Sequence, residues 1–488
     1  SPGFITFQQL ARRRNMNAEL LHSNGRSPVF VRAGILQLLA CCAVLALTLS
    51  CAEPVTRSSS TPEKAAQFSN QVQEPPSGQY EPSSRCRNCH SHIYTQFRES
   101  MHAKSYENPL FKAEFFNILL PRAENNKDLF KEAEGCIACH SPITFMQNRG
   151  DITGLMNVNQ DLSGVECDFC HTVSGYKGSV PENGNYVSQP GAQKSGPFEY
   201  KSDHHRIYSE LQTKSDVCAI CHNRTNRYGL EIISTFSEWK ESRYADQGIE
   251  CQDCHMSVRG FLTAGKPVHE SGIAAQAGLI TPQEREKIYT HRFPGAHSES
   301  QVTGAIQLDI QIDEAAVRPG EDMLVFVNVD NSRSGHKLPT GSAELRLVYL
   351  DLVADIDGKI IPLAANSLDK EMFDISGRGK FDAIILGNDI PNGRRVYRAI
   401  CVDENEQQTM YSFDAAKISF DNRLEANEIR KEFFKLQVPE NVGTEFLLIA
   451  RLNYFRYPGS FAEALGVLKA KPVELASTRK KVVLSRQP

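Results

Sequence analysis

Five short segments of the sequence place two cysteines three residues apart and a histidine directly after the second cysteine. They are CRNCH (86–90), CIACH (136–140), CDFCH (167–171), CAICH (218–222) and CQDCH (251–255). Every C-x-x-C in the chain is followed by this histidine, although only 14 of the 488 residues are histidine. Chance does not explain such repetition, so the histidine belongs to the motif.

Several kinds of chemistry use a C-x-x-C pair, but only one of them explains the histidine. A zinc site usually combines two such pairs, or one pair with two distant histidines, and needs no histidine beside the second thiolate. A thioredoxin-like dithiol occurs once, in a βαβ setting. In haem c the two thiols are joined to the porphyrin vinyl groups, and the adjacent histidine is the proximal ligand of the iron. The sequence therefore predicts five haems c.

Each motif supplies two attachment points and one iron ligand. The predicted attachment residues are Cys86, Cys89, Cys136, Cys139, Cys167, Cys170, Cys218, Cys221, Cys251 and Cys254. The predicted proximal ligands are His90, His140, His171, His222 and His255. Four of the 14 cysteines remain, so no disulfide framework is expected. Among these four, Cys401 is predicted to be a buried free thiol.

The sixth position of each iron separates electron transfer, for which a side chain fills it, from catalysis, for which it stays open. Outside the motifs and the leader, the available histidines are His92, His102, His204, His205, His269, His291, His297 and His336. Two axial nitrogens lie about 4 Å apart on opposite faces of a haem, so His92 is too near His90 in the chain to serve the same iron. A helix continuing from His90 would carry His102 about 18 Å along its axis, which suits a neighbouring haem.

His336 is the most informative of these candidates, because it lies far from any motif. It belongs to NSRSGHKLPTG (331–341), where glycine and proline predict a fixed turn that presents the side chain. If His336 binds an iron, the C-terminal part of the chain is docked on the haem-binding part. If it does not, that part is a separate adhesion or spacer module.

The sequence predicts four parts. Residues 1–51 are a leader, 52–84 a disordered tether rich in Ser, Pro, Gln and Glu, 85–300 a pentahaem domain, and 301–488 a β-sandwich. The apolar run at 33–49 fits a signal peptide, and LTLSC resembles the lipobox of bacterial lipoproteins, which predicts a lipid on Cys51. The alternative is a signal that is cleaved elsewhere or kept as a membrane anchor. The expected location is the periplasm, the outer membrane or the cell surface. A net charge of -4 argues against nucleic acid as a partner.

Sequence patterns place different elements in the two large parts. The haem-binding part is predicted to be mainly α, with short helices such as 93–105 and 282–291. Strands are predicted beyond Val302, at 305–312, 323–329, 345–363, 431–438 and 446–455. Turn signals separate them, including Asp-Gly at 357–358, and the pattern predicts an all-β immunoglobulin-like sandwich without a haem motif of its own.

The haem-binding part resembles the multihaem cytochrome c554 family, which is related to the octahaem hydroxylamine oxidoreductases. The likeness covers about residues 83–300 and rests on segments such as CRNCHSHIYTQFRESMHAKS, GVECDFCHTV and HRFPGAH. The C-terminal part is similar to β-sandwich extensions of some members. The resemblance implies distal ligands His102, His291, one of His204 and His205, and His336. The fifth would be His269 or His297, and the pattern favours His205 and His297.

Three functions fit these observations. The favoured one is electron transfer between redox donor and acceptor proteins at or beyond the cell envelope, because no separate catalytic signature is present. The second is an oxidoreductase that converts a small nitrogen or sulfur compound at one open haem, since relatives include five-coordinate haems. The third is a subunit of an extracellular cytochrome filament built from copies of the chain. The sequence has no assignable counterpart of the cross-linking tyrosine of hydroxylamine oxidoreductases.

Overall fold

The computed structural model describes residues 78–155, 161–199, 207–276, 282–296, 298–313, 317–364, 389–391 and 393–485. The chain divides into two compact units, Ser1–Ala65 and Ala66–Pro488, and every described residue belongs to the second. The predicted leader, Cys51 and most of the predicted tether lie outside the described residues. In the part of the chain that is described, no helix is long and apolar enough to cross a membrane.

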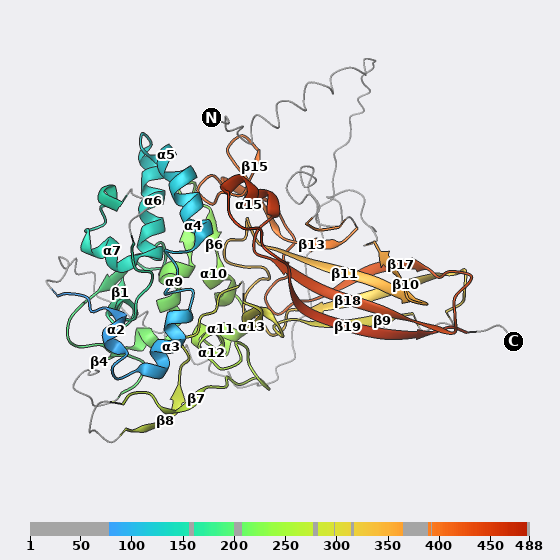
Figure 1. Cartoon of the computed structure of the whole chain (residues 1–488), viewed down its shortest axis with the longest axis horizontal. Helices are drawn as coiled ribbons and strands as arrows, with labels where there is room; N and C mark the ends of the chain where they lie inside the picture. The colour runs from blue at the N-terminus through green and yellow to red at the C-terminus, as the bar shows by residue number, and fades with distance from the viewer. Residues whose placement is uncertain are drawn as a thin grey trace, which may run out of the picture. The chain divides into compact units, whose positions relative to one another are not determined.

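Each motif lies on a short helix or at its end (Figure 1). The helices concerned are α2 (Ser83–Cys86), α6 (Lys127–His140), α8 (Cys167–Cys170), α9 (Asp216–His222) and α12 (Cys251–His255). Residues three apart on a helix lie on the same face. The helical turn therefore presents both thiols of a motif to one side, as attachment to a single porphyrin requires.

Short elements connect the motifs. The helices are α3 (Ser91–Glu99), α4 (Pro109–Glu114), η2 (Phe115–Leu119), α5 (Leu120–Ala123), α7 (Pro142–Gln147), α10 (Thr235–Lys240), α11 (Arg243–Asp246) and α13 (Glu299–Val302). The antiparallel hairpins pair β1 (Val173–Tyr176) with β2 (Tyr186–Ser188), β5 (Arg224–Thr225) with β6 (Glu231–Ile233), and β7 (Glu270–Ile273) with β8 (Glu284–Ile288). The buried apolar residues of this region form separate small clusters. Porphyrin faces would join such clusters into a core.

Two predicted helices differ from the structure. The helix predicted at 93–105 begins earlier and ends at Glu99, because Ser100 has an extended backbone with φ -71° and ψ 158°. The helix predicted at 282–291 is wrong, since this segment contains strand β8. Its charged side chains alternate between exposed and half-buried positions up to the buried Ile288. Pairing with β7 therefore outweighs the helix propensity of the segment.

The C-terminal region contains two antiparallel sheets. One has the order β17 (Ile429–Gln437), β10 (Asp322–Asp330) and β9 (Gln307–Ile312). The other has the order β12 (Lys359–Leu363), β11 (Leu347–Ile356), β18 (Glu445–Phe455) and β19 (Val473–Val483), with β13 (Arg395–Tyr397) also paired to β11. These strands confirm those predicted from the sequence beyond Val302.

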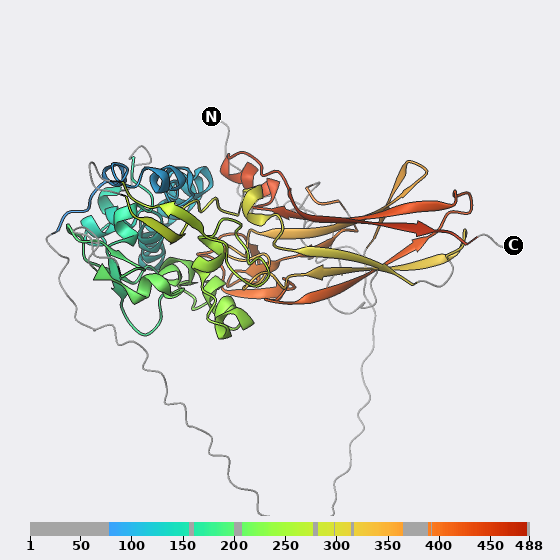
Figure 2. The same ribbon diagram turned by 90° about the horizontal axis from the view of Figure 1, so that it is seen from below.

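The two sheets share one core and form two layers (Figure 2). Val325 and Val327 of β10 and Leu350 and Leu352 of β11 are fully buried in the same core. On β17, buried and exposed residues alternate, as expected for a sheet with one solvated face. The C-terminal region is therefore β-rich, and the immunoglobulin-like topology of the sandwich stays a prediction.

The Asp357-Gly358 signal forms the predicted tight turn. Both residues have positive φ, 51° and 80°, between the paired residues Ile356 and Lys359. Two consecutive residues in this conformation are typical of a type I′ hairpin, which suits the twist of the strands. The turn fixes the register of β11 against β12.

Replacing Gly358 with alanine is expected to destabilise the protein by about 1 kcal/mol. No atom lies within 4 Å of a Cβ built at this position, so the cost comes from the positive φ alone. The free energy of unfolding from urea titration measures the effect. An unchanged urea midpoint would mean that the positive φ of residue 358 carries no cost for a residue other than glycine.

A small third sheet lies where the two regions pack together. It contains β14 (Ala399–Val402), β15 (Gln408–Thr409) and β16 (Lys417–Asp421), and helix α15 (Gly459–Leu465) follows β18. Cys401 of β14 is 1% exposed and packs with Ile232 of β6 and Ala415. The prediction of a buried free thiol at Cys401 is therefore confirmed.

Candidate haem-binding sites

Three motif histidines lie opposite a second histidine ring. The ring centres are 6.1 Å apart in His222 and His102, 6.4 Å in His171 and His291, and 6.2 Å in His255 and His336. Two imidazoles on opposite faces of one iron would have centres roughly 6 Å apart, since each metal–nitrogen bond is about 2 Å long. Each pair therefore leaves the space that an iron atom needs.

The second ring nitrogen supports the same arrangement. Nδ1 lies close to a backbone carbonyl oxygen in His90 (Ala274, 2.9 Å), His140 (Ser105, 2.9 Å), His171 (Ser195, 2.7 Å), His291 (Tyr289, 3.0 Å) and His336 (Lys337, 2.9 Å). A carbonyl oxygen can only accept a hydrogen bond, so Nδ1 carries the proton. Nε2 then keeps the lone pair that binds a metal, and the ring orientation is fixed.

Burial also keeps these imidazoles uncharged. It lowers the pKa of His102 to about 3, with a smaller contribution from neighbouring histidine charges. Burial likewise lowers the pKa of His291 to about 4. Both rings are therefore neutral at pH 7, which is the form that coordinates iron.

Thiols of different motifs contact one another. Cys86 lies beside Cys167, Cys139 beside Cys221, and Cys218 beside Cys251. The first motif thus adjoins the third, the second adjoins the fourth, and the fourth adjoins the fifth. Cys170 of the third motif is also an electrostatic neighbour of the fourth. Porphyrins attached to these sulfurs would be close neighbours, with the fourth motif as a junction.

The second motif has a different environment. Among the described residues, no second histidine ring lies opposite His140. Its imidazole is stacked on the ring of Phe111 from α4, with the centres 3.9 Å apart and the planes 5° from parallel. This contact holds the proximal side of the site without supplying a ligand for the opposite face.

Buried charges surround this second motif. Arg224 of β5 forms an ion pair with Glu132 of α6, and its charge acts on the Cys136 thiol. Burial, and then the charge of Glu344, raises the pKa of Glu114 to about 8. Burial raises the pKa of Glu344 to about 7. At pH 7 the carboxyl group of Glu114 is therefore protonated, which places a buried acid near the second motif.

The other two candidate histidines that the structure describes, His92 and His269, do not face the ring of a motif histidine, although His269 lies beside the fifth motif with its Nε2 3.9 Å from Asp253. His92 is exposed, and its Nε2 lies 2.8 Å from a carboxylate oxygen of Glu270. His269 packs edge-on against Tyr289, with ring centres 5.0 Å apart. The remaining three candidates, His204, His205 and His297, lie outside the described residues.

Residues 85–172, which contain the first three motifs, match the family described as cytochrome c554 and c-prime. The chain carries a cytochrome c554-type domain. Together with the motifs further along the chain, this makes it a multihaem c-type cytochrome with an additional β-rich C-terminal region.

Solved structures extend the comparison beyond this cytochrome c554-type domain. The chain is similar to a penta-haem cytochrome c552 from Thermochromatium tepidum, with 20% identity, a TM-score of 0.53 and coverage of 82% of this chain and 100% of that one. At this identity the likeness concerns the fold. Domains D2 and D3 of the pilin SpaD from Corynebacterium diphtheriae match with 11% identity, a TM-score of 0.18 and coverage of 36% of this chain and 51% of the other. No curated protein sequence matches the chain.

One contact beside a candidate ligand of this multihaem cytochrome has no signature in the sequence. Glu238 of α10 accepts hydrogen bonds from the backbone N–H of Lys337 (3.2 Å) and from Oγ1 of Thr340 (2.6 Å), next to His336. Arg423 donates to the same carboxylate over 2.9 Å. A single glutamate in a polar helix gives no hint of a partner about 100 residues away, so only the structure identifies it.

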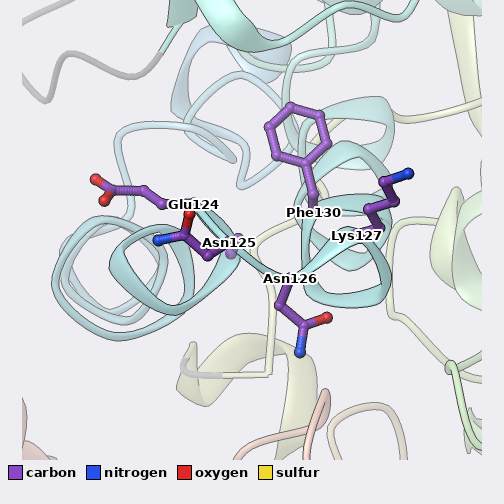
Figure 3. A pocket seen from close by; sticks show the side chains of 6 residues that line it. Glu124, Asn125, Asn126, Lys127 and Phe130 are labelled. Atoms are coloured by element: carbon purple, nitrogen blue, oxygen red, sulfur yellow. The ribbon is translucent and has the colours of Figure 1, made fainter.

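One surface pocket of the cytochrome does not involve the motifs. It has a volume of about 300 Å³ and lies between α5 and α6, lined by Ala123, Glu124, Asn125, Asn126, Lys127 and Phe130 (Figure 3). Asn126 serves there as a helix cap, accepting hydrogen bonds from the backbone of Asp128 and Leu129. We attribute no chemistry to this pocket.

Proposed function

We propose that the protein binds five haems c and transfers electrons through them between redox partner proteins. The observation that carries this proposal is the set of three histidine pairs spaced for bis-histidine iron, joined by sulfur contacts between motifs. A filled sixth position suits electron transfer, because it keeps the iron from substrates. Close packing of the motifs suits transfer from one haem to the next.

The ligand assignment follows from the pairs. His102 would serve the fourth motif, His291 the third and His336 the fifth. The family resemblance implies a distal role for one of His204 and His205, and His205 is proposed here for the first motif. Each distal ligand would thus come from a part of the chain remote from its motif, which supports the prediction that His102 serves a haem other than its nearest one in sequence.

The cellular location that we propose follows from the leader. A lipid on Cys51 would attach the protein to a membrane and place it in the periplasm or at the outer cell surface, with its redox partners at the envelope. The β-rich region, proposed to be an immunoglobulin-like sandwich, would then serve as a docking or spacing module. The same region could also join copies of the chain into a filament, which is the third function considered for this protein.

A second candidate function rests on the second motif. We propose that its haem is open on the distal side and converts a small nitrogen or sulfur compound. The absence of a histidine opposite His140 among the described residues favours this, and so do the buried Glu114 and Glu344 nearby, since reductions of such compounds consume protons. The electrons would reach this site from the fourth motif through the contact of Cys139 with Cys221.

The oxidised protein is expected to show one high-spin haem and four low-spin haems by electron paramagnetic resonance, with five haems by mass. Imidazole pairs produce the low-spin signals, and the haem of His140 produces the high-spin one. Shifts of the high-spin signal on adding nitrite or hydroxylamine would favour the second function. A spectrum with low-spin signals alone would mean that another residue, such as His297, closes the second site. Electron transfer would then be the one remaining function.

A further inference from the structure

The turn that carries His336 is contacted on its N-terminal side by rings from the haem-binding region. A Cβ atom at Gly335 would lie 3.3 Å from the Cδ1 of Trp239 and 3.3 Å from the Cδ2 of Tyr244. Trp239 is the single tryptophan of the chain, and its indole N–H donates to the backbone oxygen of Ile249 over 2.9 Å. The backbone before His336 therefore lies directly against α10 and α11.

The C-terminal side of the turn is held by Glu238 from the same helix. One carboxylate oxygen accepts from the N–H of Lys337 (3.2 Å) and the hydroxyl of Thr340 (2.6 Å). The other accepts from Ser234 (2.8 Å) and from Arg423 (2.9 Å). Each carboxylate oxygen of Glu238 thus accepts two hydrogen bonds. One of these comes from the backbone of Lys337, the residue directly after His336.

This carboxylate is paired as well as buried. The side chains of Arg423 and Glu238 are 3% and 4% exposed, and Arg423 also binds Asp421 through two nitrogens, at 3.0 Å and 2.8 Å. Arg423 also donates to the backbone oxygen of Pro339 over 3.3 Å, so displacing the turn would break hydrogen bonds to both members of this buried pair. Lys337 adds an ion pair with Glu425 at 2.8 Å on the outer side.

We propose that Glu238, Trp239 and Tyr244 form a clamp for His336, in which Glu238 is the positioning residue that holds the imidazole opposite His255. This rests on the proposed role of His336 as the distal ligand of the fifth haem. An iron–imidazole bond of about 2 Å tolerates little displacement, so a ligand from another region of the chain needs such a fixed mount. The α10–α11 segment directly precedes the fifth motif. The segment that holds His336 is therefore also the one that leads into His255, the proposed ligand on the other face of the same iron.

The test compares two buried glutamates in the full-length haem-loaded protein. Glu238→Ala is expected to produce a high-spin signal of up to one additional haem equivalent and to move the midpoint potential of that haem, with all haems still attached by mass. Glu238→Gln keeps the shape and one acceptor oxygen, so it should restore most of the low-spin signal. His336→Ala gives the reference spectrum for complete loss of the ligand.

The matched control is Glu432→Ala. Glu432 of β17 is also buried, 7% exposed, and it accepts hydrogen bonds from Tyr397 (3.0 Å) and Arg395 (3.1 Å) within the β-rich region. It should destabilise the fold without any change of spin state. If Glu238→Ala and Glu238→Gln both keep the wild-type spectrum while His336→Ala changes it, the clamp is refuted and the ligand assignment stands. If His336→Ala also has no effect, the ligand assignment itself fails.

Discussion

Replacing His336 with alanine is expected to leave every haem attached and to turn the haem of the fifth motif from low-spin to high-spin. The proposed thioether bonds of this haem would be formed by Cys251 and Cys254, which the substitution does not touch. The ring of His336 lies 6.2 Å from that of His255, centre to centre, and its Nδ1 is already engaged with the backbone of Lys337. Removing this ring would therefore remove the proposed ligand and leave the sixth position of the bound iron open.

Electron paramagnetic resonance should show one new haem equivalent of high-spin signal, and mass spectrometry should show an unchanged haem content. Imidazole added to the solution should restore the low-spin signal, because it can enter the space left by the side chain. The matched control is His92→Ala, since His92 is an exposed histidine that pairs with Glu270 and should leave the spectrum unchanged. An unaltered spectrum in the His336 variant would contradict the docking of the β-rich region through an iron ligand.

Removing the haem of the fourth motif is expected to interrupt electron flow through the whole protein. Cys218 and Cys221 contact Cys251 and Cys139, so this motif joins the fifth to the second, and Cys170 of the third lies near it. In the variant with both Cys218 and Cys221 replaced by alanine, one haem fewer should be attached. The remaining haems should be reduced in separate kinetic phases, because the junction between them is gone.

The control for this experiment is removal of the second motif instead, through Cys136→Ala and Cys139→Ala. In the described residues this motif has a thiol contact with the fourth motif only, so it should be an end of the network. The same loss of one haem should then leave the reduction of the others in a single phase. Equal kinetics in the two variants would mean that the sulfur contacts do not define the path.

Local sequence patterns were sufficient for several parts of this structure. The motifs predicted the thiol pairs and the histidine that follows each of them, and alternation of apolar residues predicted β10, β17 and β18. The Asp357-Gly358 pair predicted a tight turn, because few residue pairs adopt two consecutive positive φ angles without strain. In each of these cases the physical cause lies within a few residues of the signal.

Features that depend on distant partners were harder to predict. The segment of β8 has helix-forming residues, and only its pairing with β7 makes it a strand. Strand β19 was not predicted, since its charged residues concealed the alternation that the sheet imposes. Which histidine faces which motif depends on the whole fold. The resemblance to the cytochrome c554 family named His102, His291 and His336, but it did not say which motif each of them faces.

The three histidine pairs also bear on the stability of the chain. Each pair joins two residues on the order of 100 positions apart, and a cross-link that closes a loop of this length removes several kcal/mol of conformational entropy from the unfolded chain. An iron bound on both faces would thus act as a removable staple between remote segments. Haem binding would then complete the fold as well as the redox chain. The cross-link between His255 and His336 would form last, because His336 is synthesised after the other histidines of the three pairs.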